Sequence, residues 1–211
     1  MQRLARLHVP VISDCLDRVG LRANTMAPCI RPLATGSKAV GHAATVRLVH
    51  VDRPPAERSD YYRGEIEALE AMQPGDVMVV STCAGSYWGE LLATACRARG
   101  VLGLVADAWT RDAQALIRMD FPTFVAGISP QDSLGRTDVE AWNVPIRCGG
   151  VAVEPGDLVV ADDDGIAVIP AALGEDVISL AEAKVRTEGA MRADLAAGMP
   201  LSEAFRAYGV L

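Results

Sequence analysis

The apolar and polar positions in the N-terminal part of the chain change period several times. Residues 11–19 place apolar side chains at helical spacing and stop at Gly20, whereas residues 39–51 alternate and are rich in β-branched side chains. A short helix over 65–72 ends at a Gln-Pro-Gly-Asp turn, and an apolar strand over 77–80 follows it. This part of the chain therefore predicts helix, strand, helix and strand in that order.

The middle of the chain alternates more regularly. A helix that begins at Trp88 or Gly89 is followed by a continuous apolar strand over 101–106, a helix over 111–119 and a strand over 124–126. Strands that are separated by single helices pair in parallel through right-handed crossovers. We therefore expect a parallel β-α-β core inside a buried sheet.

The C-terminal part returns to strands before a long helix. Residues 144–153 and 157–168 are strand-like, and an Asp-Asp-Asp-Gly stretch at 162–165 is typical of a hairpin turn, because Asp-Gly readily takes the positive φ that such turns need. A long amphipathic helix from Ala171 to Ala197 follows, with a short helix over 202–208. A helix of this length and pattern indicates a contact between subunits.

The length of 211 residues predicts a single domain over 1–211, in which 171–211 form a C-terminal helical segment. Half of the residues are hydrophobic, so a sizeable core can form without disulfides or structural metals. The net charge of −7 and the pI near 5.0 argue against nucleic acid as a partner, because phosphate binding needs concentrated Lys and Arg. The sequence therefore predicts an α/β protein without a nucleic-acid surface.

The cysteines and histidines narrow the cofactor chemistry. The five cysteines form no Cys-x-x-Cys pair, and neither a signal peptide nor a long apolar run is evident, which favours a cytoplasmic protein with reduced thiols and no membrane contact. The three histidines lack zinc-ligand spacing. Any bound metal should be a hard divalent cation held by carboxylates and water.

Two loops carry the candidate chemistry. Residues 83–89 and 107–110 each leave the carboxyl end of a predicted parallel strand and enter a helix N-terminus, where ligands bind and free N–H groups attract anions. Arg111, in the predicted first turn of its helix, opposes the helix dipole at a cost of roughly 0.3–1 kcal/mol, so we expect it to face a carboxylate. Glu90 and Asp112 are equally well explained as acids that the dipole favours.

The spacing of these residues matches one enzyme family. Over about residues 10–190 the chain resembles the RraA-like family, which contains class II pyruvate aldolases and the regulators of ribonuclease activity A. The acid-x20-Arg-Asp pattern of Glu90 and Arg111-Asp112 would be weak alone. It is supported by the stretches Gly89–Thr94, Arg97–Gly100, Gly103–Val105 and Pro155–Gly165.

The resemblance implies both a fold and an activity. The fold would be an α-β-β-α sandwich with a central mixed sheet, assembled as a homotrimer or homohexamer with sites between subunits. The activity would be that of a lyase: divalent-metal-dependent retro-aldol cleavage of a 4-hydroxy-2-oxo dicarboxylic or tricarboxylic acid to pyruvate, with oxaloacetate decarboxylase side activity. The family's substrates are 4-hydroxy-4-methyl-2-oxoglutarate and 4-carboxy-4-hydroxy-2-oxoadipate.

The resemblance also assigns roles at the motif positions. Asp112 would be the protein ligand of Mg²⁺ or Mn²⁺, and Glu90 would hold one of the waters that such a metal keeps. Arg111 would bind the carboxylate and carbonyl side of a small 2-oxo acid through its bidentate fork. A Schiff-base mechanism is disfavoured, because the only lysines, Lys38 and Lys184, are distant from these loops in sequence.

Backbone groups and a second chain complete the implied site. The N–H groups of Leu91 and Leu92, which follow Gly89 at the helix N-terminus, would receive the carboxylate of the pyruvyl moiety. An acid from the C-terminal helix of a neighbouring subunit would support the metal waters, with Glu188 as the candidate and Glu182 as its competitor.

The sequence leaves some alternatives open. Trp109 stands where these aldolases usually have glycine, so its side chain either narrows the substrate cleft or packs outward at a subunit boundary. Two other functions compete with the aldolase. One is a non-catalytic regulator that binds an RNA-degrading enzyme through its acidic surface, and the other is a metal-dependent hydroxy-acid dehydratase.

Overall fold

The order of helices and strands follows the predicted alternation. The computed structural model describes residues 1–210; Leu211, at the end of the predicted C-terminal segment, lies outside the described residues. The helices are α1 (Val9–Arg18), α2 (Arg63–Glu70), α3 (Glu90–Ala98), α4 (Ala113–Met119), α5 (Gly174–Ala196) and α6 (Leu201–Tyr208), with 3-10 turns η1 (Leu4–Arg6), η2 (Arg58–Asp60) and η3 (Ala171–Leu173). The strands are β1 (Arg31–Pro32), β2 (Ala39–His50), β3 (Asp76–Val80), β4 (Ser86–Trp88), β5 (Gly103–Thr110), β6 (Thr123–Ile128), β7 (Thr137–Trp142), β8 (Ile146–Cys148), β9 (Val151–Val153), β10 (Leu158–Asp162) and β11 (Gly165–Ile169).

Within residues 1–210, nine strands form one mixed sheet whose centre is parallel. β2, β3, β5 and β6 lie side by side in parallel, with β3 between β2 and β5. β10 and β11 extend the sheet antiparallel at one end, and β1 does so at the other. β4 pairs with β5, and β7 pairs with β2. This arrangement confirms the predicted mixed sheet and its parallel β-α-β core.

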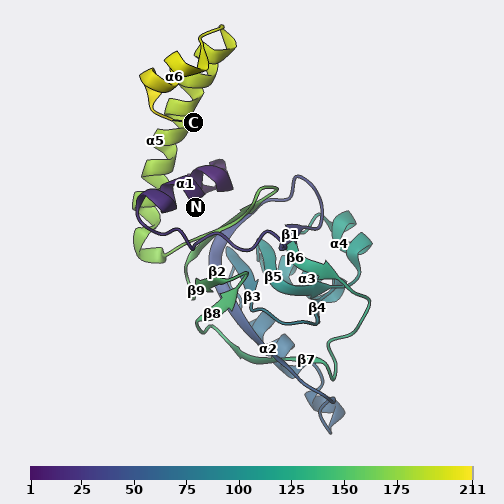
Figure 1. The fold of residues 1–211 in the computed structure, drawn as a ribbon. Helices are drawn as coiled ribbons and strands as arrows, with labels where there is room; N and C mark the ends of the chain where they lie inside the picture. Colours follow the sequence, from purple (N-terminus) through teal and green to yellow (C-terminus); the bar gives the residue numbers. More distant parts are fainter. Residues whose placement is uncertain (211) are drawn as a thin grey trace.

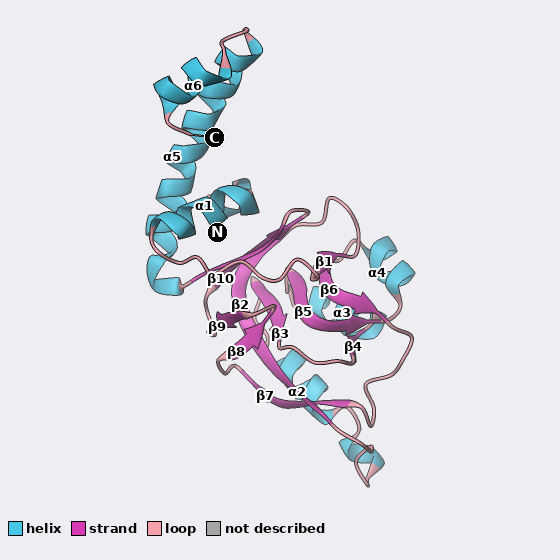
Figure 2. Ribbon diagram, viewed as in Figure 1, coloured by secondary structure: helices cyan, strands magenta, loops and turns pink. Residues whose placement is uncertain are grey.

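The two faces of the sheet are covered in different ways (Figure 2). Helices α2, α3 and α4 cover one face, and their core includes Trp88, Leu104 and Phe121. The small sheet β8–β9 covers the other face, where Phe124 and Val153 are buried. α1 and α5 pack on β10 and β11, on the face of the sheet that lies opposite β8–β9. The central mixed sheet with its covering helices and long C-terminal helix confirms the expected α/β class.

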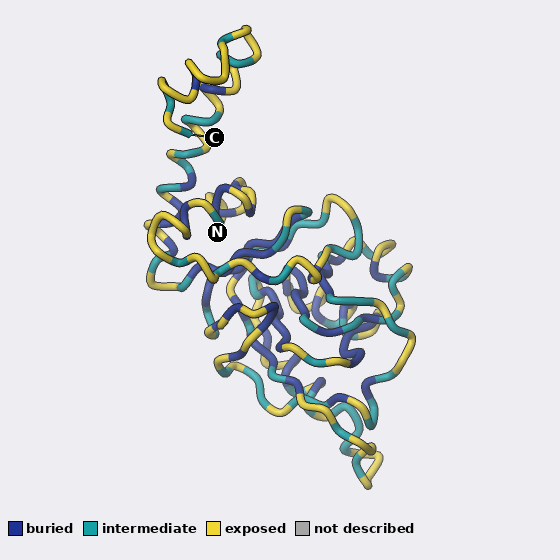
Figure 3. The backbone as a smooth tube through the Cα atoms, in the orientation of Figure 1, coloured by how far each residue is buried: buried dark blue, intermediate teal, exposed yellow. Residues whose placement is uncertain are grey.

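The long C-terminal helix projects from the body of the molecule (Figure 1). α5 packs against α1 at its base, where Arg3 forms ion pairs with Glu175 and Glu182. Farther out, α5 packs with α6, and this part is largely exposed (Figure 3). We call α5 and α6 the C-terminal arm. In the part of the chain that the structure describes, no helix is long and apolar enough to cross a membrane.

The segments around the two predicted loops differ from expectation. The sequence predicts loops over 83–89 and 107–110, but Ser86–Trp88 form β4, and β5 continues to Thr110 through a register shift in its pairing with β6. The predicted helix start at Arg111 is also wrong. α4 begins at Ala113, because the residue before it has a left-handed backbone that no α-helix contains.

Candidate active site

Two strand-to-helix junctions meet at the carboxyl edge of the parallel strands. β4 leads through Gly89 into α3, and β5 leads through Arg111 and Asp112 into α4. Gly89 has extended backbone, and a Cβ atom there would lie 2.8 Å from Asp112 Oδ2 and 3.3 Å from Arg111 Cγ. A real side chain does not fit at such distances, so glycine allows the two junctions to approach each other.

Asp112 links the two junctions. It has a φ of 57° and is the N-cap of α4, a conformation that a short polar residue tolerates. Its Oδ2 accepts the backbone N–H of Glu90 at 3.1 Å, one of the N–H groups at the start of α3 that have no helical acceptor. Because α4 begins after Asp112, Arg111 precedes the helix. The predicted place of Arg111 within the first turn of the helix is therefore wrong.

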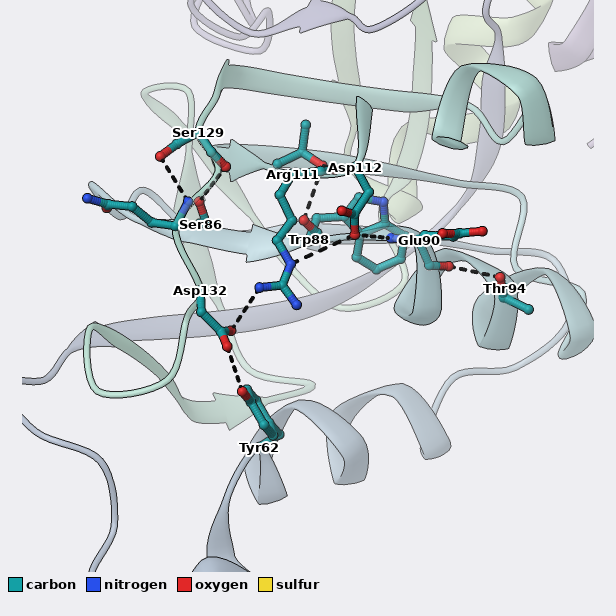
Figure 4. A network of polar contacts seen from close by, with 11 residues as sticks. Tyr62, Ser86, Trp88, Glu90, Thr94, Arg111, Asp112, Ser129 and Asp132 are labelled. Carbon is teal, nitrogen blue, oxygen red and sulfur yellow. Dashed lines mark hydrogen bonds and ion pairs between the residues drawn. The ribbon is translucent and has the colours of Figure 1, made fainter. Parts of the chain in front are cut away.

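Arg111 extends between two carboxylates (Figure 4). Its backbone N–H donates to the carbonyl of Trp88 at 2.9 Å, which fixes the base of the side chain. The guanidinium Nε lies 3.8 Å from Asp112 Oδ2, and Nη1 lies 3.3 Å from Asp132 Oδ1. Arg111 therefore faces carboxylates, as the sequence predicts. It does so from a position before α4 rather than from within the first turn of that helix.

Asp132 and Tyr62 form a second polar contact beside Arg111. The Tyr62 hydroxyl donates a hydrogen bond to Asp132 Oδ2 at 2.7 Å. Partial burial acts to raise the pKa of Asp132, but the hydrogen bond from Tyr62 and the positive charge of Arg111 outweigh it, so the pKa falls below its usual value. The same hydrogen bond raises the pKa of Tyr62. Asp132 is therefore ionised and Tyr62 neutral at neutral pH.

Glu65 is a buried acid in the same region. It lies in the first turn of α2 and is 6% exposed. Burial raises its pKa to about 7, although a hydrogen bond with Ser133 and the charge of Arg111 act to lower it. Asp132 adds to the rise through like-charge repulsion. Glu65 is therefore a carboxyl group that exchanges its proton near neutral pH.

These residues line one cleft of about 620 Å³. The junction wall of the cleft consists of Gly89, Glu90, Leu91, Leu92, Arg111 and Asp112. The second wall consists of Tyr62, Glu65, Ile66, Gln131, Asp132 and Ser133, and β4 supplies the rest of the lining. A cleft of this size that combines apolar surface with a few polar groups is typical of a small-molecule site.

The junction wall contains all the predicted site residues of the two motif segments, whereas the predicted C-terminal acids lie elsewhere in the chain. Glu188 is on α5, 3.4 Å from Lys184, and Glu182 pairs with Arg3. A contribution from α5 of a neighbouring subunit therefore stays a prediction. Trp109 lies outside the cleft lining; its Cδ1 would be 3.0 Å from a Cβ atom placed on Gly127 of β6.

The sequence reasoning missed the second wall. Tyr62 and Glu65 come from the start of α2, and Asp132 and Ser133 come from the loop after β6. No spacing motif links these segments. The position of Asp132 could have indicated its role. Asp132 follows the carboxyl end of a parallel strand, as Arg111 does, and the loops after such strands share one edge of the sheet.

The donor set at Asp112 fits a hard divalent cation that keeps most of its waters. Among residues 1–210, no three His, Cys, Asp or Glu side chains form a cluster that could hold a metal. Mg²⁺ is commonly bound through one or two carboxylates, with water and substrate oxygens in the other positions. Asp112 is half-exposed at the cleft, and Glu90 is exposed beside it. Asp112 would thus be the one carboxylate of such a site, because Glu90 contacts it through its backbone N–H.

The fold and the site define an α/β protein with a carboxylate-lined cleft at the edge of its parallel strands. The chain belongs to the RraA-like family: the family described as "RraA-like: Aldolase/RraA" matches residues 9–168. This finding confirms the resemblance that the acid-x20-Arg-Asp pattern indicates.

Individual relatives carry different descriptions. A protein of Halalkalibacterium halodurans named "Putative 4-hydroxy-4-methyl-2-oxoglutarate aldolase" is 34% identical over 176 residues, which cover 82% of this chain and 77% of the relative. A solved structure of an uncharacterized protein from Pseudomonas syringae pv. tomato has a TM-score of 0.85 and 28% identity, covering 98% of this chain and 92% of that one. Streptomyces coelicolor RraAS2, described as an unusual member of the RNase ES inhibitor RraA protein family, has a TM-score of 0.81 and 29% identity, covering 92% and 96%.

Proposed function

We propose that the protein is a divalent-metal-dependent lyase that cleaves a 4-hydroxy-2-oxo acid to pyruvate and a second carbonyl compound. The observation that carries the proposal is the meeting of Glu90, Arg111 and Asp112 on one wall of a cleft large enough for such an acid. The relative named for 4-hydroxy-4-methyl-2-oxoglutarate supports that compound as the first substrate to test.

The 2-oxo acid would bind through its carboxylate to the junction wall. The N–H groups of Leu91 and Leu92 are at the N-terminus of α3, where the helix dipole favours an anion. The guanidinium of Arg111 supplies further donors from the same wall. Donors from a backbone and from a side chain would together orient the substrate across the cleft.

The bond cleavage needs proton transfer at two atoms. A Mg²⁺ or Mn²⁺ ion at Asp112 would supply Lewis acidity that stabilises negative charge on the 2-oxo oxygen. Glu90 would hold a water beside the C4 hydroxyl and assist removal of its proton. Breakage of the C3–C4 bond then leaves a carbonyl at C4, and protonation at C3 completes pyruvate. Loss of CO₂ from oxaloacetate leaves the same three-carbon unit, so oxaloacetate decarboxylation should accompany the cleavage.

Pyruvate release from 4-hydroxy-4-methyl-2-oxoglutarate and from oxaloacetate, with Mg²⁺ and after its removal by a chelator, tests the proposal. Asp112→Asn keeps a residue that tolerates the left-handed N-cap but removes the charge, and we expect kcat/KM to fall by about 10³ or more. Asp120→Asn is the matched control, because Asp120 has a φ of 55° at the other end of α4 and lies outside the cleft lining. Wild-type activity in Asp112→Asn would contradict the metal site.

The proposal includes an assembly. Homotrimers or homohexamers in contact through the C-terminal arm would let Glu188, or Glu182, of one subunit approach the cleft of another. The exposed surface of the arm supports this arrangement (Figure 3). Light scattering that gives the mass of a single chain would contradict it.

A second function is supported by the likeness to Streptomyces coelicolor RraAS2. The chain, with its net charge of −7, would bind and inhibit an RNA-degrading enzyme. Inhibition of RNA cleavage by purified protein, unchanged in Arg111→Ala and Asp112→Asn, would support this function. Lack of inhibition at micromolar concentrations of the wild-type protein would contradict it.

A further inference from the structure

Asp132 belongs to the second wall but contacts the motif residue Arg111. It lies in the loop between β6 and β7, and its Oδ1 is 3.3 Å from Arg111 Nη1. Arg111 Nε faces Asp112 Oδ2 at 3.8 Å. Two carboxylates from separate loops therefore engage two nitrogens of one guanidinium, as Figure 4 shows.

Asp132 is itself held in place from several sides. Its Oδ2 accepts the hydroxyl proton of Tyr62 at 2.7 Å, and the backbone N–H groups of Ser133 and Leu134 help to lower the pKa of its carboxyl. Tyr62 has a φ of 58°, which is unusual for a large side chain and persists only where the surroundings determine the conformation. Asp132 is therefore a fixed anchor rather than a mobile surface acid.

A fixed anchor changes what Arg111 can do. An arginine side chain has many rotamers, and it loses conformational entropy when a ligand fixes it. The contact with Asp132 restricts the Arg111 side chain before a ligand arrives. Less conformational entropy is then lost on binding, and the affinity is higher. The guanidinium also stays inside the cleft rather than extending into solvent, because the two carboxylates that it contacts, Asp112 and Asp132, lie on different walls.

We propose that Asp132, anchored by Tyr62, is the positioning residue of Arg111 and thereby sets the affinity of the cleft for the carboxylate of a 2-oxo acid. The inference rests on the proposed function for the identity of the ligand, but carboxylate binding can be measured without turnover. Asp132 acts through Arg111, so its removal matters only while Arg111 is present. Because the carboxylate is bound both before and during bond cleavage, weaker binding raises KM more than it lowers kcat.

The test compares Asp132→Ala, Asp132→Asn, Arg111→Ala and the Asp132→Ala/Arg111→Ala double variant. For each variant, KM and kcat are measured for pyruvate release, and the Kd of oxalate is measured by calorimetry with saturating Mg²⁺. We expect Asp132→Ala to raise KM and the oxalate Kd about tenfold and to lower kcat less than about threefold. Asp132→Asn keeps an oxygen for Arg111 and a partner for the Tyr62 hydroxyl, and it should recover to within about threefold of wild type.

Two further variants guard against a merely structural effect. Tyr62→Phe removes the hydroxyl that anchors Asp132 and leaves both charges, so it should weaken oxalate binding by about threefold. Asp138→Asn is the matched control, because Asp138 is an acid of β7 that accepts the N–H of Val139 and lies outside the cleft lining. It should change neither KM nor the oxalate Kd, and the thermal midpoint of each variant verifies its fold.

The double variant decides the question. With Arg111 absent, Asp132→Ala should have no further effect on oxalate binding. An equal effect in both backgrounds would overturn the proposal, and so would tighter binding by Asp132→Ala, which would make Asp132 a competitor of the ligand. If wild type releases no pyruvate but oxalate binding depends jointly on both residues, the proposed function fails and the positioning role stands. If wild type cleaves the substrate and the two effects are additive, the positioning role fails and the function stands.

Discussion

The junction wall and the second wall of the cleft use carboxylates in opposite surroundings. On the junction wall, Glu90 is exposed at the start of α3 and Asp112 is half-exposed. On the second wall, Glu65 is buried with a pKa of about 7, and Asp132 is held ionised by Tyr62 and by the charge of Arg111. Glu90 is thus exposed to a ligand and Glu65 is buried, whereas Asp112 and Asp132 both contact Arg111 from their separate walls. Each wall can therefore be perturbed with a distinct readout.

The largest expected effect on stability belongs to the second wall. The pKa of Glu65 is about 7 in the folded chain and near 4.5 otherwise, so ionisation favours the unfolded state between these values. The neutral form contributes full stability below about pH 4.5, and this contribution is lost as the pH rises through 7. Glu65→Gln should remove this loss, which is about 3 kcal/mol.

Thermal and urea unfolding from pH 4.5 to pH 8 measures the effect of Glu65→Gln. The variant should gain stability over wild type steadily across this range and reach a constant advantage above pH 7.5. Glu70→Gln is the control, because Glu70 is an exposed acid at the end of the same helix. Parallel pH curves for wild type and Glu65→Gln would show that Glu65 is solvated, and the contrast between the two walls would then disappear.

The next effect tests the close approach within the junction wall. Gly89→Ala would place a Cβ atom 2.8 Å from Asp112 Oδ2, so the carboxylate must move away from the N–H of Glu90. We expect kcat/KM for pyruvate release to fall about thirtyfold, which corresponds to about 2 kcal/mol. Gly189→Ala on α5 has open space around its Cβ position and serves as the control. Unchanged kinetics in Gly89→Ala would mean that the two junctions are not coupled.

The smallest effect separates backbone from side chain at the start of α3. Leu91→Pro removes an N–H group that has no helical acceptor, and proline is tolerated in the first turn of a helix. We expect KM to rise about tenfold, because one donor to the substrate carboxylate is lost. Leu91→Ala keeps the N–H and removes a side chain that is 80% exposed, so it should behave as wild type. Equal kinetics for both variants would exclude the α3 N-terminus as the carboxylate site.

The two walls also differ in how far the sequence predicts them. The junction wall could be predicted from the sequence, because Glu90 and Arg111 follow apolar strands. Their spacing is typical of the family and can be recognised without knowledge of long-range contacts. The parallel core could also be predicted, because the hydrophobic residues of its strands and helices recur with clear periods. The start of α4 could not be predicted, because the conformational propensity of aspartate does not distinguish the left-handed backbone of Asp112 from a helical one.

The second wall depends on contacts between distant segments. Tyr62 reaches Asp132 across 70 positions of the chain, and no local pattern encodes that contact. β4 and β7 were hidden for a related reason. β4 has three residues and exists through its pairing with β5, and β7 is mostly half-buried and has no clear apolar face. The residues that tune the motif are thus the ones that only the tertiary structure identifies.

The left-handed backbone at Asp112 restricts how this chain can diverge. Glycine, asparagine and aspartate are the residues that take this conformation readily, and of these three aspartate alone is negatively charged. A drift from aspartate to asparagine would exchange one oxygen for one nitrogen, leave the turn intact and remove the candidate metal ligand. In a family that includes proteins named for catalysis and proteins described as inhibitors, the fold would tolerate the loss of that candidate ligand through a single codon change.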